Sequence, residues 1–242
     1  MKFLFFALLL TACATTWQPS PDFNYAPVHA GEYEIATYQK MTNQKSPVHI
    51  YIEGDGRAFD ANGQPTDDPT PRGTMMRSLA MRDNAPNVAY IARPCQFIMS
   101  PSCTTVHDWT DGRFSPRIID TMSMVVRKIA GNRPIILIGY SGGAMVSGLV
   151  IEHNPKLPIQ RWITIAGVLN HHKWTEYFGD APLTKSLDLT QMPNVPATHF
   201  VGTRDKVVPM ELTRDAVGNT GKIIEIPNAT HTGFTDIDIF DY

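Results

Sequence analysis

The chain has 242 residues, and its 21 Lys and Arg side chains nearly balance its 23 Asp and Glu side chains, for a formal net charge of −2. A chain of this length can bury the core of one α/β domain without disulfides or metals to support it. The near-neutral charge and the lack of basic runs argue against nucleic acid as a partner. No apolar run reaches the length of a membrane-spanning helix.

The N-terminus has the pattern of an export signal. Met1-Lys2 gives a positive start, residues 3–10 are apolar, and Leu-Thr-Ala-Cys ends at Cys13. This pattern resembles the lipobox of bacterial lipoproteins, which implies a lipoprotein signal peptide over residues 1–12 and a lipidated Cys13. The expected partner is then a lipid bilayer, into which acyl chains such as palmitate on Cys13 anchor the protein. An ordinary secretory signal with an incidental Cys is the alternative.

Cys13 is followed by Ala14 rather than Asp, which in a Gram-negative cell resembles the outer-membrane sorting pattern. The expected location is therefore the bacterial cell envelope, with the protein lipid-anchored at the outer membrane or cell surface rather than free in the periplasm. Residues 13–30 are rich in Pro, Thr and Ser and are predicted to form a flexible tether. The folded domain is predicted over residues 31–242.

The domain is predicted to begin with strands over residues 32–39 and 48–52. The second strand ends in Glu-Gly-Asp-Gly-Arg, where Arg57 is a candidate partner for the carboxylate of Asp55. Glu53 and Asp55 could also form an acidic pair for sugar chemistry or metal binding. Alternate residues of a strand face opposite sides, which argues against that pairing.

Residues 70–83 are predicted to form a helix because Thr-Pro is a favourable start, and residues 87–93 are predicted to form a strand. Cys95 and Cys103 follow. An even number of cysteines in an exported chain favours a disulfide between them. Two free thiols are expected instead if the chain stays in a reducing compartment.

A buried strand and a helix meet at Gly139-Tyr140-Ser141-Gly142-Gly143, after four branched apolar residues. A strand that turns directly into a helix strains its corner residue, and small residues two positions either side avoid a collision. The motif resembles the nucleophile elbow of α/β-hydrolases, with Ser141 as nucleophile. The chain is identified as a member of that superfamily over about residues 30–240.

This resemblance implies an α/β fold, the α/β-hydrolase fold: a mostly parallel central sheet of about seven to eight strands flanked by helices. It also implies a short cap segment over about residues 168–196. The backbone N–H of Gly142 is expected in the oxyanion hole, with a second N–H from Asp55 or Gly56. Residues 93–115 further resemble an uncharacterised bacterial lipoprotein subgroup of this superfamily. The resemblance rests on Arg-Pro-Cys, a second Cys, Trp-Thr and Arg-Phe-Ser.

Aromatic residues near the carboxyl ends of strands are candidates for the substrate pocket, because loops at that edge shape the pocket in such sheets. These candidates are Trp109, Phe114, Tyr140 and Trp174. Packing within their own loops is the alternative for Trp109 and Phe114.

The remaining triad residues are expected after the elbow, in the superfamily's chain order. Gly-Thr-Arg-Asp-Lys-Val-Val-Pro resembles the acid loop, with Asp205 as the residue that orients the base. His231 lies just after the last predicted strand, where a general base must be to reach Ser141. A surface aspartate in a turn is the alternative for Asp205.

These residues predict a serine hydrolase that acts on a small-molecule acyl ester through an acyl-enzyme, and a carboxylic ester hydrolase of the bacterial envelope is favoured. No cofactor is expected, and no metal, because adjacent histidines such as His171-His172 seldom chelate without further ligands. One alternative is a catalytically silent binding or envelope protein on the same fold. Another is a serine peptidase or thioesterase.

Overall fold

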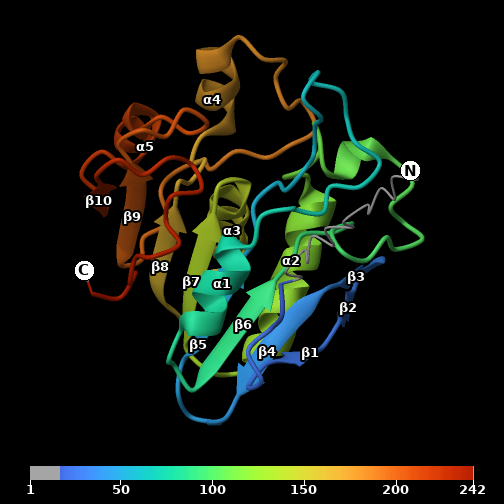
Figure 1. The fold of residues 1–242 in the computed structure, drawn as a ribbon, viewed down its shortest axis with the longest axis vertical. Coiled ribbons are helices and arrows are strands. Elements are labelled where there is room, and N and C mark those ends of the chain that lie inside the picture. The colour runs from blue at the N-terminus through green and yellow to red at the C-terminus, as the bar shows by residue number, and fades with distance from the viewer. Residues whose placement is uncertain (1–16, 242) are drawn as a thin grey trace, which may run out of the picture.

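The computed structural model describes residues 17–241, so the predicted signal peptide and Cys13 lie outside the described residues. Its centre is an eight-stranded sheet with strand order β1-β4-β6-β5-β7-β8-β9-β10 (Figure 1). A separate two-stranded ribbon pairs β2 with β3. The strands are β1 Asn24–Tyr25, β2 Val28–Ala30, β3 Tyr33–Ile35, β4 Thr37–Met41, β5 Val48–Ile52, β6 Asn87–Ile91, β7 Ile135–Tyr140, β8 Ile159–Ile165, β9 Ala197–Gly202 and β10 Lys222–Ile226.

The sheet is mostly parallel, as expected. Strands β6, β5, β7, β8, β9 and β10 run in one direction, and only β4 and β1 are antiparallel to their neighbours at one edge. The carboxyl ends of the parallel strands therefore meet at a single edge of the sheet, where open α/β sheets bind their ligands.

Helices cover both faces of the sheet. Helix α1 packs against β5 and β6, whereas α2 and α3 pack against each other on the opposite face (Figure 1). The helices are α1 Met75–Arg82, α2 Pro116–Ala130, α3 Gly142–His153, α4 His171–Phe178 and α5 Met210–Val217, with one 3₁₀ turn over Val106–Asp108. Within residues 17–241, no helix is both long enough and apolar enough to cross a bilayer.

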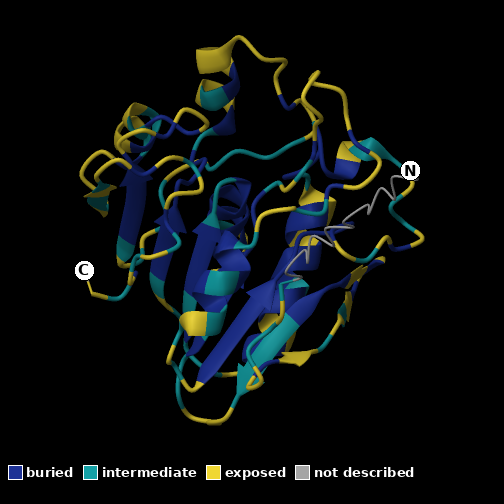
Figure 2. Ribbon diagram, viewed as in Figure 1, coloured by how far each residue is buried: buried dark blue, intermediate teal, exposed yellow. Residues whose placement is uncertain are grey.

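The sequence pattern explains the burial of these elements. In α2, Ile118, Met122, Val125 and Ile129 recur at helical spacing and are buried, so one stripe of the helix faces the sheet. The apolar run of β7 is covered on both sides, as a parallel strand between helix layers should be. Figure 2 shows the central strands β6, β5 and β7 as mostly buried, whereas the outer strands β1, β4 and β10 are largely intermediate or exposed. Helix α4 stands out from the body with an exposed end.

The flexible tether predicted over residues 13–30 is wrong for its described part. Residues 17–30 contain β1 and β2, the Phe23 side chain is only 6% exposed, and the Trp17 ring packs edge-on against Tyr38 at 5.3 Å. The apolar side chains of this segment outweigh its Pro and Ser content, because β4 offers an open sheet edge that β1 covers.

The start of α1 also differs from expectation. The helix begins at Met75 rather than near Pro71, because Thr70 does not cap it. Instead, the hydroxyl of Thr70 accepts the N–H of Phe97 at 2.7 Å, which ties the preceding loop to a distant segment.

Candidate active site

Ser141 occupies the sharp turn between β7 and α3. Its backbone has φ 52° and ψ −124°, a conformation that a residue other than Gly adopts only under strain. A side chain on Gly139 would strike the backbone carbonyl of Gly143, and one on Gly143 would strike the carbonyls of Ile52 and Glu53. Both glycines are therefore required for a helix to start this close to the sheet.

The structure brings the three predicted triad residues together at the carboxyl edge of the sheet. His231 Nε2 lies 3.0 Å from Ser141 Oγ, and His231 Nδ1 lies 2.9 Å from Asp205 Oδ2. Asp205 follows β9, and His231 follows β10. Asp205 lies 64 positions after Ser141, and His231 lies 26 positions after Asp205. They converge because β9 and β10 pair in parallel with the rest of the sheet.

Hydrogen bonds to the backbone fix Asp205 and His231. Asp205 Oδ1 accepts the N–H groups of Val207 and Val208 at 2.8 and 2.9 Å, which leaves Oδ2 for His231. The Asp205 side chain is fully buried, so no water competes for that oxygen. The Tyr140 hydroxyl donates to the backbone carbonyl of His231 at 3.3 Å and packs beside its ring. The imidazole is thus held in one orientation.

The segment predicted to form the oxyanion hole lies against the elbow. Gly142 is the first residue of α3, and the first N–H groups of a helix have no partner within the helix. A side chain on Gly142 would collide with the carboxylate of Asp55, so this carboxylate lies directly against Gly142. Gly56, with φ 65°, packs so closely on the carbonyl of Pro69 that no larger residue fits.

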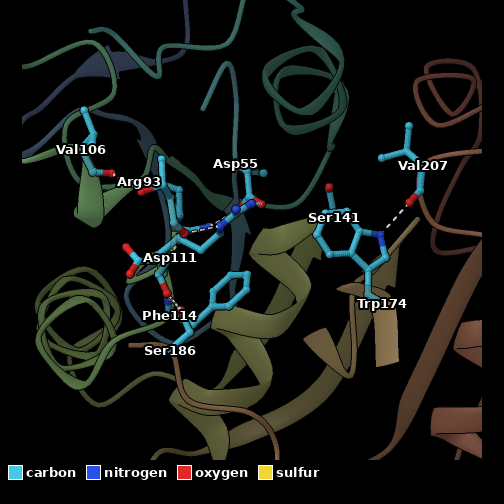
Figure 3. A network of polar contacts seen from close by, with 12 residues as sticks. Asp55, Arg93, Val106, Asp111, Phe114, Ser141, Trp174, Ser186 and Val207 are labelled. Atoms are coloured by element: carbon cyan, nitrogen blue, oxygen red, sulfur yellow. Dashed lines mark hydrogen bonds and ion pairs between the residues drawn. The ribbon is translucent and has the colours of Figure 1, made fainter. Parts of the chain in front are cut away.

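The carboxylate of Asp55 is paired with Arg93 and Arg113, not with Arg57 as the sequence suggested. Asp55 Oδ1 accepts from Arg93 Nη1 at 3.1 Å and Asp55 Oδ2 from Arg113 Nη1 at 2.6 Å (Figure 3). Burial by itself would raise the pKa of the Asp55 carboxyl, but the guanidinium groups of Arg113 and Arg93 outweigh it and hold that pKa below its ordinary value. The expected partner, Arg57, instead reaches the carbonyl of Asp68.

Glu53 is the second carboxylate at this edge, and it points into the core. Its oxygens accept the N–H of Gly54 and the hydroxyl of Tyr90, each at 2.9 Å. Burial raises the pKa of Glu53, and these two hydrogen bonds offset only part of the rise. Glu53 and Asp55 therefore have separate partners and do not act as an acidic pair.

The predicted disulfide between Cys95 and Cys103 is present, with an S–S distance of 2.11 Å. It closes the loop that follows Arg93. In the same loop, Gln96 accepts the N–H of Arg93 at 3.0 Å and donates to the carbonyl of Gly54 at 2.9 Å. The disulfide loop thus supports both Arg93 and the backbone before Asp55.

A cavity of about 480 Å³ opens beside Ser141 and His231. Two of the four predicted pocket residues, Tyr140 and Trp174, line it. The other two do not. The Trp109 side chain is 6% exposed and donates to the carbonyl of Thr66, and Phe114 is 1% exposed within the core. Both are turned inward against other segments, because Trp109 bonds to Thr66 and the Phe114 ring packs 5.8 Å from that of His171.

The segment predicted as a short cap contains one helix and is joined to the loop that follows Asp205. Helix α4 begins at His171, after Asn170 caps it by accepting the N–H of Lys173. The indole N–H of Trp174 donates to the carbonyl of Val207 at 2.7 Å (Figure 3). Among residues 17–241, no cluster of three or more His, Cys, Asp and Glu side chains is arranged to hold a metal ion.

Sequence reasoning missed Arg93 and Arg113, which neutralise Asp55. Arg93 ends up beside Asp55 because β6 lies next to β5. Arg113 precedes α2 and donates from Nε to the carbonyl of Thr110 at 2.6 Å, which aims its free end at the site. No spacing in the sequence links these arginines to residue 55.

Comparison with known proteins identifies both a family and a fold. The family model described as "Serine hydrolase (FSH1)" matches residues 75–229. No curated protein sequence matches the chain.

Solved structures, α/β serine hydrolases among them, share the fold at low sequence identity. Est1E from Butyrivibrio proteoclasticus, with ferulic acid bound, is 14% identical, with 86% of this chain and 91% of that chain covered and a TM-score of 0.63. XC6422 from Xanthomonas campestris, described as a serine hydrolase without lid, is 13% identical, with 88% of each chain covered and a TM-score of 0.55. A serine hydrolase homologue from Coxiella burnetii is 16% identical, with 90% and 92% covered and a TM-score of 0.55.

Proposed function

The chain belongs to the serine hydrolase (FSH1) family, and we propose that it is a carboxylic ester hydrolase with Ser141, His231 and Asp205 as its catalytic triad. The observation that carries this proposal is the position of His231, whose two ring nitrogens lie 3.0 Å from Ser141 Oγ and 2.9 Å from Asp205 Oδ2. A base within hydrogen-bond reach of the nucleophile, held by a third residue, is the arrangement that activates a serine.

In the acylation half, Ser141 Oγ attacks the ester carbonyl carbon while His231 Nε2 takes the hydroxyl proton. The buried Asp205 keeps the other proton on Nδ1 and stabilises the imidazolium that forms. The N–H of Gly142, with a second N–H from Asp55 or Gly56, donates a hydrogen bond to the carbonyl oxygen and stabilises the negative charge that develops there. Each such donor is typically worth about 3–4 kcal/mol in the transition state. The imidazolium then protonates the alcohol as it leaves.

In the deacylation half, water replaces the alcohol. His231 takes a proton from the water as its oxygen attacks the acyl-enzyme carbonyl, and then returns that proton to Ser141 Oγ as the carboxylic acid departs. The serine and the imidazole both regain their starting states, so one ester and one water give one acid and one alcohol.

The experiment treats the domain with a fluorophosphonate probe and reads labelling by intact mass. Wild-type protein is expected to gain one probe, and Ser141→Ala and His231→Ala are expected to gain none. His153→Ala serves as the matched histidine control, since His153 is exposed at the end of α3. Labelling that survives Ser141→Ala, or no labelling of the folded wild type, would refute the triad and favour a silent binding protein.

The kind of acyl bond is tested separately. Matched esters, thioesters and anilides with the same acyl group are compared by kcat/KM. The proposal predicts that the ester is turned over fastest relative to its uncatalysed rate. A clear preference for the thioester or the anilide would reassign the protein as a thioesterase or a peptidase.

We also propose that the enzyme works at the bacterial envelope through a lipidated Cys13. The lipobox-like sequence that ends at Cys13 supports this proposal. Full-length protein expressed in a bacterium with an alkyne-bearing fatty acid is expected to incorporate the label and to fractionate with membranes. Cys13→Ser should lose both properties, and label retained by that variant would refute the site.

A further inference from the structure

The cavity at Ser141 has two chemically different sides. Figure 3 shows Asp55 and Arg93 on one side of Ser141 and Trp174 with Val207 on the other. Val168 adds to the apolar side, which belongs to the cap and the acid loop. An extended ester that places its carbonyl at Ser141 must send one arm toward each side.

The side that contains Asp55 carries an excess of positive charge. Arg57, Arg72 and Arg113 all line the cavity there, and within the described residues only Glu53 and Asp55 supply carboxylates to its wall. Asp55 is shared between Arg113 and the buried Arg93, so this group of three side chains retains one positive charge.

Glu53 does little to offset this charge. The residue is 4% exposed, and its carboxyl oxygens accept the Tyr90 hydroxyl and the Gly54 N–H on the core side. Both carboxyl oxygens are therefore occupied by these two buried donors rather than turned toward the space beside Ser141.

Arg57 and Arg72 keep guanidinium donors that the fold does not use. Arg57 donates one long hydrogen bond, 3.5 Å to a backbone carbonyl, and its buried Nε has no hydrogen-bond partner among the described residues. Arg72 is exposed, and within residues 17–241 it makes no hydrogen bond or ion pair. Both side chains line the same cavity, and the N–H of Arg57 bonds to the carbonyl of Pro69, which holds their two backbone segments side by side. Two guanidinium groups with free donors at a cavity wall suit a carboxylate or phosphate oxygen pair.

We propose that Arg57 and Arg72, backed by the net charge of Asp55 with Arg93 and Arg113, form a subsite for an anionic group of the substrate. The enzyme is then selective for esters that carry a carboxylate or phosphate on one arm and an apolar group on the other. This inference rests on the proposed ester hydrolase function and adds the chemical class of the substrate.

Two pairs of matched esters test it, and they differ in which arm carries the charge. The acyl pair is 4-nitrophenyl valerate and the 4-nitrophenyl monoester of glutaric acid, which share chain length and leaving group. The alcohol pair is 4-acetoxyphenylacetate and its neutral primary amide. In the acid, the benzene ring and a methylene separate the carboxylate from the leaving phenolic oxygen. In at least one pair, the anionic ester is expected to have about tenfold higher kcat/KM at low salt, which corresponds to about 1.4 kcal/mol. The preference should fall as salt screens the arginines.

Arg57→Gln and Arg72→Gln, made singly, are each expected to reduce the ratio of anionic to neutral turnover severalfold. Because Arg72 is exposed, its variant should fold even if Arg57→Gln does not. The matched control is Arg214→Gln, which removes the same charge from an exposed ion pair on α5 and should leave the ratio unchanged.

The failure of this inference differs from the failure of the proposed function. If Ser141-dependent turnover is found but the anionic ester is preferred in neither pair, the anionic subsite is wrong and the hydrolase stands. A preference for anionic esters that survives both Arg57→Gln and Arg72→Gln also overturns the subsite. Absence of Ser141-dependent turnover for all four esters would instead count against the ester hydrolase itself.

Discussion

Arg113 Nη1 donates to Asp55 Oδ2 at 2.6 Å, across 58 residues of sequence. The carboxylate that receives this bond lies against Gly142, the residue proposed to stabilise the oxyanion. An unpaired carboxylate in this place would oppose negative charge on the substrate. The two arginines therefore convert an unfavourable position into one with net positive charge.

Removal of the shared carboxylate should be costly. Asp55→Ala leaves the guanidinium groups of Arg93 and Arg113 unpaired, and their side chains are only 5% and 6% exposed. Loss of one partner of a buried ion pair typically costs about 3–5 kcal/mol of unfolding free energy. Urea unfolding followed by circular dichroism measures this cost. Asp180→Ala, at an exposed position after α4, should change stability by less than about 0.5 kcal/mol. Equal stability of the two variants would contradict the pairing.

Much of the site follows from sequence because it depends on local chemistry. The elbow needs Gly139 and Gly143 to be small, and in the structure both lie too close to backbone carbonyls to carry a side chain. Asp205 and His231 follow parallel strands, so their convergence on Ser141 comes from the order of the strands. Local patterns combined with a parallel sheet were enough to place three side chains.

The rest depends on contacts that no local pattern records. Arg113 reaches Asp55 only because the loop before α2 folds back over the carboxyl edge of the sheet. Trp109 and Phe114 occupy that same loop, and their spacing does not tell which side faces the cavity. The prediction of a flexible tether fails over residues 17–30 because it rests on Pro, Thr and Ser content alone. Amino-acid composition does not show that β4 leaves an open sheet edge with which this segment pairs.

Acid should destabilise the fold partly through His199. Burial lowers the pKa of His199 to about 4, and its Nδ1 lies 2.8 Å from the hydroxyl of Thr164. In the unfolded chain this histidine takes up a proton near pH 6.5, whereas in the folded protein it stays neutral down to about pH 4. The stability that depends on the neutral form is therefore fully present above about pH 6.5. That contribution, about 3 kcal/mol, is lost as the pH falls from about 6.5 toward 4.

The measurement is the free energy of unfolding of wild type and His199→Gln between pH 4 and 7. The wild type should lose more stability than the variant as the pH falls. Parallel curves would show that His199 does not titrate in this way. His153→Gln, at an exposed histidine, is the control and should follow the wild type.

The disulfide should contribute to stability through the short loop that it closes. Cys95 and Cys103 are 8 residues apart, for which the chain-entropy treatment gives about 2–3 kcal/mol. For a domain of this size the Cys95→Ser/Cys103→Ser double variant should melt about 5–10 °C lower. Reductant should lower the melting temperature of the wild type but not that of the double variant. A reductant effect on both would place its cause elsewhere.

Asp205→Asn separates orientation of the base from folding. The amide can still accept the N–H groups of Val207 and Val208, but it cannot hold the imidazole in the required tautomer. We expect kcat to fall by about 10⁴-fold with little change in melting temperature, as the same change does in a serine protease triad. Asp215→Asn, on the exposed side of α5, should keep wild-type kcat. A loss of kcat below tenfold in Asp205→Asn would remove Asp205 from the triad.

The most direct test of the account is capture of the acyl-enzyme. The wild-type protein is mixed with 4-nitrophenyl acetate, quenched in acid within milliseconds to seconds and digested for mass spectrometry. The account predicts an acetyl group on Ser141, with a burst of nitrophenol that does not exceed one per active site. Ester turnover with no acyl group on Ser141, or with the group on another residue, would contradict it.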